Sequence, residues 1–140
     1  MENIKLHRYD AKLPINIYCD AAKTAGLGYV LTQPDESSKK EYILYCGSTG
    51  LTDAQKRWAM CEIEMAAVVY SLINAKHLTY GANDIRIYTD HQPLIGVSKK
   101  CFDDIDNPRL AKMFELIAHY NFDLTHIPGK ENVPADVLSR

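Results

Sequence analysis

Four acidic residues stand where a folded chain could bring their carboxylates together. Asp20 and Asp90 each directly follow an apolar, strand-like run, and active-site groups in α/β sheets gather at the carboxyl ends of strands. Glu64 lies beside the apolar stripe of a predicted helix, and Asp136 lies in the first turn of a predicted last helix. If the four converge, they form a cluster of oxygen ligands.

The chemistry of such a cluster follows from its charge. Carboxylates that are brought together repel one another and lose solvation, so the site is unfavourable without a cation. Oxygen ligands suit Mg²⁺, which keeps several waters and takes its remaining ligands from phosphate. Two such ions a few ångströms apart can activate a water molecule and stabilise the leaving oxygen of a phosphodiester.

Each of these residues also has an ordinary structural explanation. An aspartate after a strand often serves only in a turn, and Asp136 is favoured near a helix N-terminus by the helix dipole. Glu64 could be a partly exposed helix glutamate. Glu62 falls closer to the centre of the same apolar face. Helical periodicity alone therefore does not choose between Glu62 and Glu64.

The segments around these residues predict an α/β fold. Alternating apolar residues indicate strands at 15–19, 29–32, 42–46, 85–89 and 122–127, the first ending at Asp20. The polar patch at 34–40 separates two of these runs and is typical of a hairpin loop. The first three strands are joined by short turns, which favours an antiparallel meander within a sheet of mixed strand directions.

Three helices are predicted from capping residues and helical spacing. Thr52, with Gln55 three residues later, matches a capping box and opens a long helix. That helix is apolar on two sides, so we expect it to be central and covered on both. Asn107 and Pro108 open a second helix to about Tyr120, and Asn132 caps a last helix over 133–138. A shorter helix is expected near 93–97.

Length and composition limit the class of protein. The 140 residues fit one domain spanning 1–140, and no apolar run approaches the ~20 residues that span a bilayer. The four cysteines lack zinc-ligand spacing and are predicted to be reduced packing residues, which favours an intracellular protein; they are Cys19, Cys46, Cys61 and Cys101.

The net charge of −2 argues mildly against a nucleic-acid binder, because the neutralisation of phosphates supplies most non-specific affinity. Two features could offset it. Metal ions could neutralise clustered carboxylates, or another domain could hold the substrate.

At the acidic residues the sequence resembles the ribonuclease H domain of gypsy-type (Metaviridae) long-terminal-repeat retrotransposon reverse transcriptases. Four stretches carry the resemblance, in the expected order and across nearly the whole chain. They are Tyr18-Cys19-Asp20-Ala21-Ala22 with Gly26-x-Gly28-x-Val30-Leu31; Glu62-x-Glu64-x-Ala66-Ala67-Val68-Val69; Tyr88-Thr89-Asp90-His91-Gln92-Pro93-Leu94; and Tyr120-x-Phe122 with Pro128-Gly129-Lys130-x-Asn132-Val133-Pro134-Ala135-Asp136-Val137-Leu138-Ser139-Arg140.

The resemblance implies a ribonuclease H-like α/β fold. Its five-stranded mixed sheet has strands one to three antiparallel, strands one, four and five parallel, and helices on both faces. It implies catalysis and metal ligation by four residues, with Glu62 as a supporting residue or salt-bridge partner; the four are Asp20, Glu64, Asp90 and Asp136. It also implies two Mg²⁺ ions, for which Mn²⁺ could substitute.

Three further residues are candidates for contact with the substrate. Gln92 corresponds to the position that reaches the minor groove of the hybrid, where 2′-hydroxyls distinguish RNA from DNA; a solvent-facing glutamine at the start of a helix is the alternative. Ala21 follows the first aspartate. Arg109 belongs to a small basic set that a solvated surface explains equally well, together with Lys99, Lys100 and Lys112.

The chain departs from retroviral and cellular relatives at the histidine that precedes their last aspartate. No histidine lies between His126 and Asp136, and His126 alternates with Leu124 as expected of a structural strand residue. His91 follows a proposed ligand and could orient it. We therefore expect slower turnover than that of a free-standing cellular enzyme, and no basic handle helix supports binding of the hybrid.

The resemblance implies an endoribonuclease that cuts the RNA strand of RNA–DNA hybrids during reverse transcription. Its implied partners are the hybrid and the polymerase and connection parts of the same reverse transcriptase, with no membrane. We expect a domain cut from a longer Pol polyprotein, located in the cytoplasm in retroelement particles. The alternatives are a catalytically silent connection domain, a host-derived binding module, and another nuclease of the same fold such as an integrase or resolvase.

Overall fold

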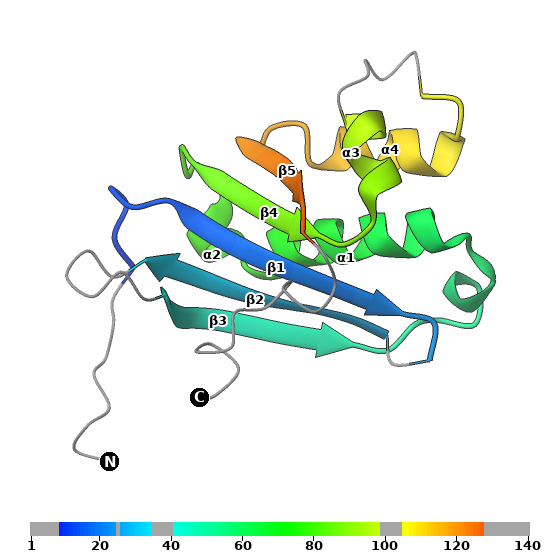
Figure 1. Ribbon diagram of the computed structural model, residues 1–140, viewed down its shortest axis with the longest axis horizontal. Coiled ribbons are helices and arrows are strands. Elements are labelled where there is room, and N and C mark those ends of the chain that lie inside the picture. The colour runs from blue at the N-terminus through cyan, green and yellow to red at the C-terminus, as the bar shows by residue number, and fades with distance from the viewer. Residues whose placement is uncertain (1–8, 25, 35–40, 99–104, 128–140) are drawn as a thin grey trace.

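A five-stranded sheet forms the frame of the molecule, with the strands in the order β3-β2-β1-β4-β5 (Figure 1). The computed structural model describes residues 9–24, 26–34, 41–98 and 105–127. The strands are β1 (Ile15–Ala22), β2 (Gly26–Pro34), β3 (Glu41–Thr49), β4 (Ile85–Thr89) and β5 (Phe122–His126). The helices are η1 (Gln55–Arg57, a 3₁₀ helix), α1 (Met60–Asn74), α2 (Lys76–Thr79), α3 (Gln92–Ser98) and α4 (Pro108–Leu116).

The strand directions confirm the predicted mixed sheet. β2 pairs antiparallel with both β1 and β3, whereas β4 pairs parallel with both β1 and β5. The parallel pairs need crossover connections, which the segments containing α1 and α3–α4 supply. Because β1 and β4 run side by side in the same direction, their carboxyl ends meet at one edge of the sheet.

The central helix α1 packs against β1 and β2 (Figure 1). Every residue from Glu62 to Val68 is buried, as expected for a helix covered on more than one side. The side chain of Cys19 points from β1 into this contact, where its sulfur lies 3.6 Å from the Ser71 hydroxyl. In the described part of the chain, no helix combines the length and the apolar character needed to cross a membrane.

The predicted start of the long helix is wrong by about eight residues. Thr52 and Gln55 do form the expected reciprocal pair, in which each side chain accepts a hydrogen bond from the other residue's backbone N–H, at 3.1 and 3.0 Å. However, this pair begins only η1, because Trp58 and Ala59 are extended, with ψ of 155° and 154°. The long helix starts after this break, at Met60.

Other boundaries shift less. β1 continues to Ala22, so Asp20 lies within the strand rather than after it. α4 begins at Pro108 as predicted but ends at Leu116, not near Tyr120. The helix predicted over 133–138 lies outside the described residues. Among the cysteines, Cys19 is buried as a packing residue should be, whereas Cys46 is exposed; Cys101 is not among the described residues.

The turn after Asp20 depends on one glycine. Gly26 has φ of +101°, which favours glycine, and a side chain there would collide with the backbone carbonyl of Thr49 in β3. Gly26 pairs with Ala22 at the end of the β1–β2 ladder. It therefore lets the end of β3 approach the start of β2, the strand that pairs with β1 beside Asp20.

We predict that Gly26→Ala destabilises the fold more than Gly81→Ala. Gly81 also has positive φ, at +84°, but open space surrounds it, so its substitution costs only the left-handed conformation, about 1–2 kcal/mol. Gly26→Ala adds the collision with Thr49. The free energies of unfolding in urea measure the difference, and equal losses would contradict the close approach of β3.

Candidate active site

The parallel pairing of β1 and β4 brings Asp20 and Asp90 to equivalent positions. Tyr18 is opposite Tyr88 in the register, and each aspartate follows its tyrosine by two residues. The two tyrosine rings stack, with centroids 4.9 Å apart, which fixes the strands against each other just before the aspartates. Both Asp20 and Asp90 are exposed, so their carboxylates are open to solvent at this edge.

Glu64 reaches the same edge from α1. Its side chain is almost fully buried, with 3% of the residue exposed. Its carboxylate accepts a hydrogen bond of 3.1 Å from the hydroxyl of Thr89, the last residue of β4. The Thr89 hydroxyl also accepts a 3.2 Å hydrogen bond from the backbone N–H of His91. Thr89 thus ties the helix glutamate to the loop that carries Asp90.

The surroundings of Glu64 disfavour its negative charge. Burial is the largest cause, and the charges of Asp90 and Asp20 add to it; together they raise the pKa of Glu64 from 4.5 to about 7, although the hydrogen bond from Thr89 opposes the shift. The structure therefore places two of the other predicted carboxylates, Asp20 and Asp90, within electrostatic reach of Glu64. Asp136 lies outside the described residues.

The three carboxylates do not close around one point. Within the described ranges, no group of three or more His, Cys, Asp or Glu side chains is placed so that it could hold a metal ion. The donor set nevertheless suits a hard cation, because it consists of carboxylate oxygens whose mutual repulsion a cation would relieve.

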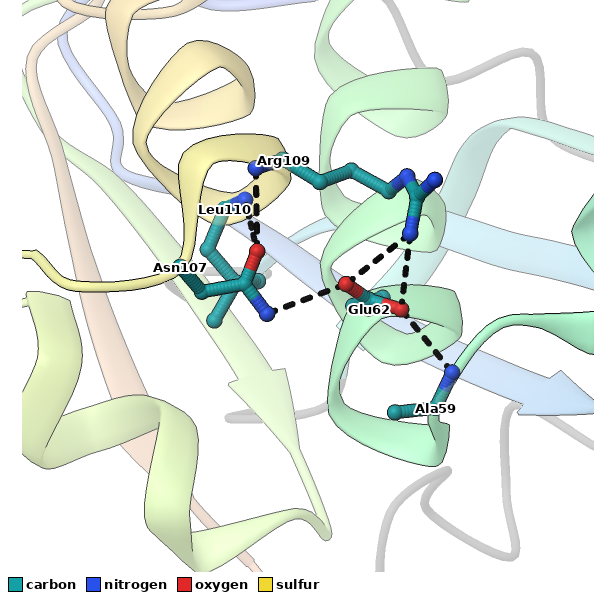
Figure 2. Close-up of polar contacts among 5 residues, drawn as sticks. All are labelled: Ala59, Glu62, Asn107, Arg109 and Leu110. Atoms are coloured by element: carbon teal, nitrogen blue, oxygen red, sulfur yellow. Dashed lines mark hydrogen bonds and ion pairs between the residues drawn. The ribbon is translucent and has the colours of Figure 1, made fainter.

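Glu62 has the opposite environment. It is also buried, but its carboxylate accepts hydrogen bonds from the Ala59 backbone N–H at 2.9 Å and from the Asn107 side chain at 3.0 Å. Arg109 adds an ion pair of 3.1 Å (Figure 2). These donors, the Asn107 amide first, lower the pKa of Glu62 against the effect of burial. Its predicted role as a salt-bridge partner is confirmed.

The three predicted substrate contacts are placed differently. Gln92 is exposed at the first residue of α3, two residues after Asp90. Ala21 is buried in β1 beside Asp20. The side chain of Arg109 is about half exposed, at 48%, but its charge is paired with Glu62 and its guanidinium lies 4.6 Å from the centre of the Trp58 ring. Arg109 is therefore held in place by contacts within the protein, with Glu62 and Trp58.

His126 is not a packed strand residue. It is the last residue of β5, is exposed, and stands opposite Thr89 in the parallel register. The alternation of His126 with Leu124 indicates a strand, and β5 confirms it. The exposed side chain of His126 does not itself support the predicted structural role. Thr89 was not among the predicted site residues. Its position facing α1 could have been inferred, because it continues the alternation of the buried strand residues Ile85 and Ile87.

Comparisons with known proteins found similar sequences. The family model that describes the RNase H-like domain found in reverse transcriptase matches residues 10–120. Two Drosophila melanogaster relatives are similar along the chain: the retrovirus-related Pol polyprotein from transposon opus, 38% identical over 91% of this chain, and that from transposon gypsy, 32% identical over 99%. The chain spans 12% of the length of each.

A solved structure shares the fold. The N-terminal RNase H domain of a Mycobacterium tuberculosis protein superposes with a TM-score of 0.58 at 15% sequence identity, covering 86% of this chain and 86% of that one. At this identity the likeness concerns the arrangement of the strands and helices, which agrees with the ribonuclease H-like fold that the sequence indicated.

We predict that Glu64→Gln stabilises the metal-free protein at pH 8. The pKa of Glu64 is about 7 in the fold and 4.5 ordinarily, so its ionisation opposes folding, and the free energy of unfolding falls as pH rises from about 4.5 to about 7. With EDTA present, the variant should gain about 1–3 kcal/mol at pH 8, allowing for solvent screening, and almost nothing at pH 4.

Glu62→Gln is the matched control, because it removes a buried carboxylate two residues away whose pKa is lowered rather than raised. Its loss should destabilise the protein at pH 8, with a smaller effect in acid. Urea unfolding at both pH values measures the two variants. If Glu64→Gln and Glu62→Gln both lose stability at pH 8, the inference that the ionised Glu64 carboxylate destabilises the fold is wrong.

Proposed function

The chain belongs to the family of RNase H-like domains found in reverse transcriptases, and we propose that it is an endoribonuclease that cuts the RNA strand of RNA–DNA hybrids during reverse transcription. Its relatives are Pol polyproteins of long-terminal-repeat retrotransposons. The observation that carries the proposal is the buried Glu64 beside Asp20 and Asp90, since an uncompensated carboxylate cluster of this kind marks functional sites more often than structural ones.

We propose Mg²⁺ as the cofactor, with Mn²⁺ able to substitute. Asp20, Glu64 and Asp90 would hold two ions together with Asp136. When bound, such ions supply an activated water and charge stabilisation for the leaving oxygen of a phosphodiester. The positions of the chain's own residues support this proposal: β1 and β4 bring the two aspartates to one edge of the sheet, and α1 brings Glu64 against Thr89.

Recognition of the hybrid is proposed for the surface next to this edge. Gln92 is exposed close to Asp90 in the chain and has the amide donors and acceptor that a minor groove lined with 2′-hydroxyls requires. Since Arg109 is already paired with Glu62, it offers little free charge to phosphates. We propose that the polymerase and connection parts of a longer Pol protein, acting in retroelement particles, supply most of the grip on the substrate.

Cleavage of a labelled RNA–DNA hybrid with Mg²⁺ tests the proposal. The parent chain should cut only the RNA strand, and Glu64→Gln should lose at least about 100-fold in rate, more than the loss typical of groups that merely support metal ligands. Glu115→Gln, an exposed carboxylate of α4, is the control and should cut as the parent does.

Low salt and high protein concentration offset the weak grip expected from a net charge of −2. If the parent remains silent, the assay is repeated with the polymerase part attached. If the longer protein does not cleave the hybrid either, the proposed nuclease function is rejected, and a catalytically silent binding module of the same fold is favoured.

We further predict that Mg²⁺ raises the melting temperature of the parent. A ligand that binds only the folded state stabilises it by about 2.7 kcal/mol at 100 times its Kd. Asp20→Asn should weaken this response, yet raise the melting temperature in EDTA by relieving its repulsion of Glu64. The absence of any Mg²⁺ effect on the parent would argue against a formed site.

A further inference from the structure

One carboxylate joins the starts of two helices. Glu62, at the third position of α1, accepts a hydrogen bond from the backbone N–H of Ala59, which precedes the helix. The same carboxylate accepts from Asn107 and pairs with Arg109 at the start of α4 (Figure 2). We call Glu62, Asn107 and Arg109 the helix clamp.

Asn107 serves both helices through one amide group. Its side-chain oxygen accepts from the backbone N–H groups of Arg109 and Leu110, at 2.9 and 3.1 Å, and so caps α4. Its side-chain nitrogen donates to Glu62 at 3.0 Å. Because the oxygen is committed to the cap, the nitrogen is directed at Glu62, and the relative positions of the two helix starts are fixed by a single planar group.

Arg109 completes the helix clamp from the solvent side. Its Nη1 lies 3.2 and 3.1 Å from the two Glu62 oxygens, and its guanidinium rests on Trp58, 4.6 Å from the ring centre. Trp58 belongs to the extended stretch between η1 and α1. The segment that leads into α1 is therefore held by the same arginine that pairs with Glu62.

The first turns of α1 are held on two sides. Glu62 points toward α4, whereas Glu64, two residues later, reaches Thr89 in β4. Two residues on an α-helix are separated by about 200° of rotation and 3 Å of rise, so the two side chains leave one rigid segment in different directions. A rotation or shift of this segment would move both.

We propose that Glu62 is a positioning residue: its contacts with Asn107 and Arg109 hold the start of α1 so that Glu64 stays in place beside Asp20 and Asp90, and thereby set the affinity of this site for Mg²⁺. This inference rests on the proposed function. The helix clamp would act before the cation arrives, when the site most needs support.

Repulsion supplies the reason for such support. Asp20 and Asp90 follow paired positions of β1 and β4 at the edge of the sheet that Glu64 reaches, and carboxylates brought together repel one another when no cation is bound. Among the described residues, one hydrogen bond, from the Thr89 hydroxyl, holds the Glu64 carboxylate at this edge. The helix clamp involves several hydrogen bonds to a charged group, which are stronger than hydrogen bonds between neutral groups. The helix clamp can therefore hold the start of α1 against the repulsion between the carboxylates. A site whose ligands are already in place binds a cation without the free-energy cost of ordering them.

The experiment measures the Mg²⁺ concentration that gives half-maximal cleavage of the hybrid by the 140-residue chain. Glu62→Gln should raise this concentration about tenfold, the lower end of the range for residues that orient metal ligands, while the rate at saturating Mg²⁺ stays within about twofold of the parent. The Mg²⁺ concentration needed for a given rise in melting temperature should increase by the same factor, because the stabilisation depends on the ratio of the Mg²⁺ concentration to its Kd; this gives a readout independent of activity.

Arg86→Gln is the matched control. It breaks another arginine–carboxylate pair with the same N–O distance of 3.1 Å, to Asp84, at the opposite end of β4 from Asp90. Both variants are assayed at a temperature at which circular dichroism shows them folded. A general loss of stability would lower the amount of active protein in either variant but would not change the Mg²⁺ requirement.

A double variant separates the helix clamp from unrelated effects. Arg109 is half exposed, so Arg109→Gln is expected to fold even if Glu62→Gln is strongly destabilised. If both act through one contact, Glu62→Gln/Arg109→Gln should shift the Mg²⁺ requirement no more than the larger single change. Trp58 is the only tryptophan, so its fluorescence reports whether Arg109 has left the ring.

The outcomes separate this inference from the proposed function. Cleavage by the parent with an unchanged Mg²⁺ requirement in Glu62→Gln and Arg109→Gln overturns the helix clamp and leaves the nuclease intact. If the parent does not cleave, the dependence of the melting temperature on Mg²⁺ concentration still decides whether the helix clamp sets Mg²⁺ affinity. If the parent neither cleaves nor responds to Mg²⁺, the proposed function fails and the helix clamp as a positioning device fails with it.

Discussion

Burial of the Glu64 carboxylate beside two other acids is the constraint around which the site is organised. A charge removed from water must be neutralised, paired or hydrogen-bonded, and within the described part of the chain Glu64 receives a single hydrogen bond, from the Thr89 hydroxyl. The remaining compensation has to come from a proton or a cation. The parallel pairing of β1 and β4 creates this condition, because it puts Asp20 and Asp90 at the same level next to the helix that carries Glu64.

Glu62 and Glu64 show that burial alone does not define such a residue. They are 6% and 3% exposed and lie two positions apart on one helix, yet the pKa of Glu62 is lowered and that of Glu64 is raised. The difference lies in their partners. Among the residues that the structure describes, Glu62 has three donors, one of them cationic, whereas Glu64 has one neutral donor and two like charges nearby. The neighbouring groups, rather than the extent of burial, therefore distinguish the carboxylate of Glu62 from that of Glu64.

The strands and their directions were predictable, because alternation and turn residues are local signals and the family resemblance supplied their order. The start of α1 was not, since the pair of Thr52 and Gln55 is a real cap that opens only a short 3₁₀ helix before the chain becomes extended at Trp58. Nor could periodicity choose Glu64 over Glu62, because the helix is buried on several sides. The contacts of Asn107 and Arg109 with Glu62 could not be predicted either. They join residues 45 to 47 positions apart, so no local pattern in the sequence indicates them.

The same contacts bear on how a chain with a net charge of −2 could bind a polyanion. An arginine contributes to phosphate binding by releasing counterions, and Arg109 can do so only by giving up its pair with Glu62 and its contact with Trp58. The fold therefore uses the charge of Arg109 to hold the starts of α1 and α4 together. Under the proposed function we therefore expect a division of labour, in which this domain provides the carboxylates, while bound cations and other parts of a longer protein provide the attraction for the nucleic acid.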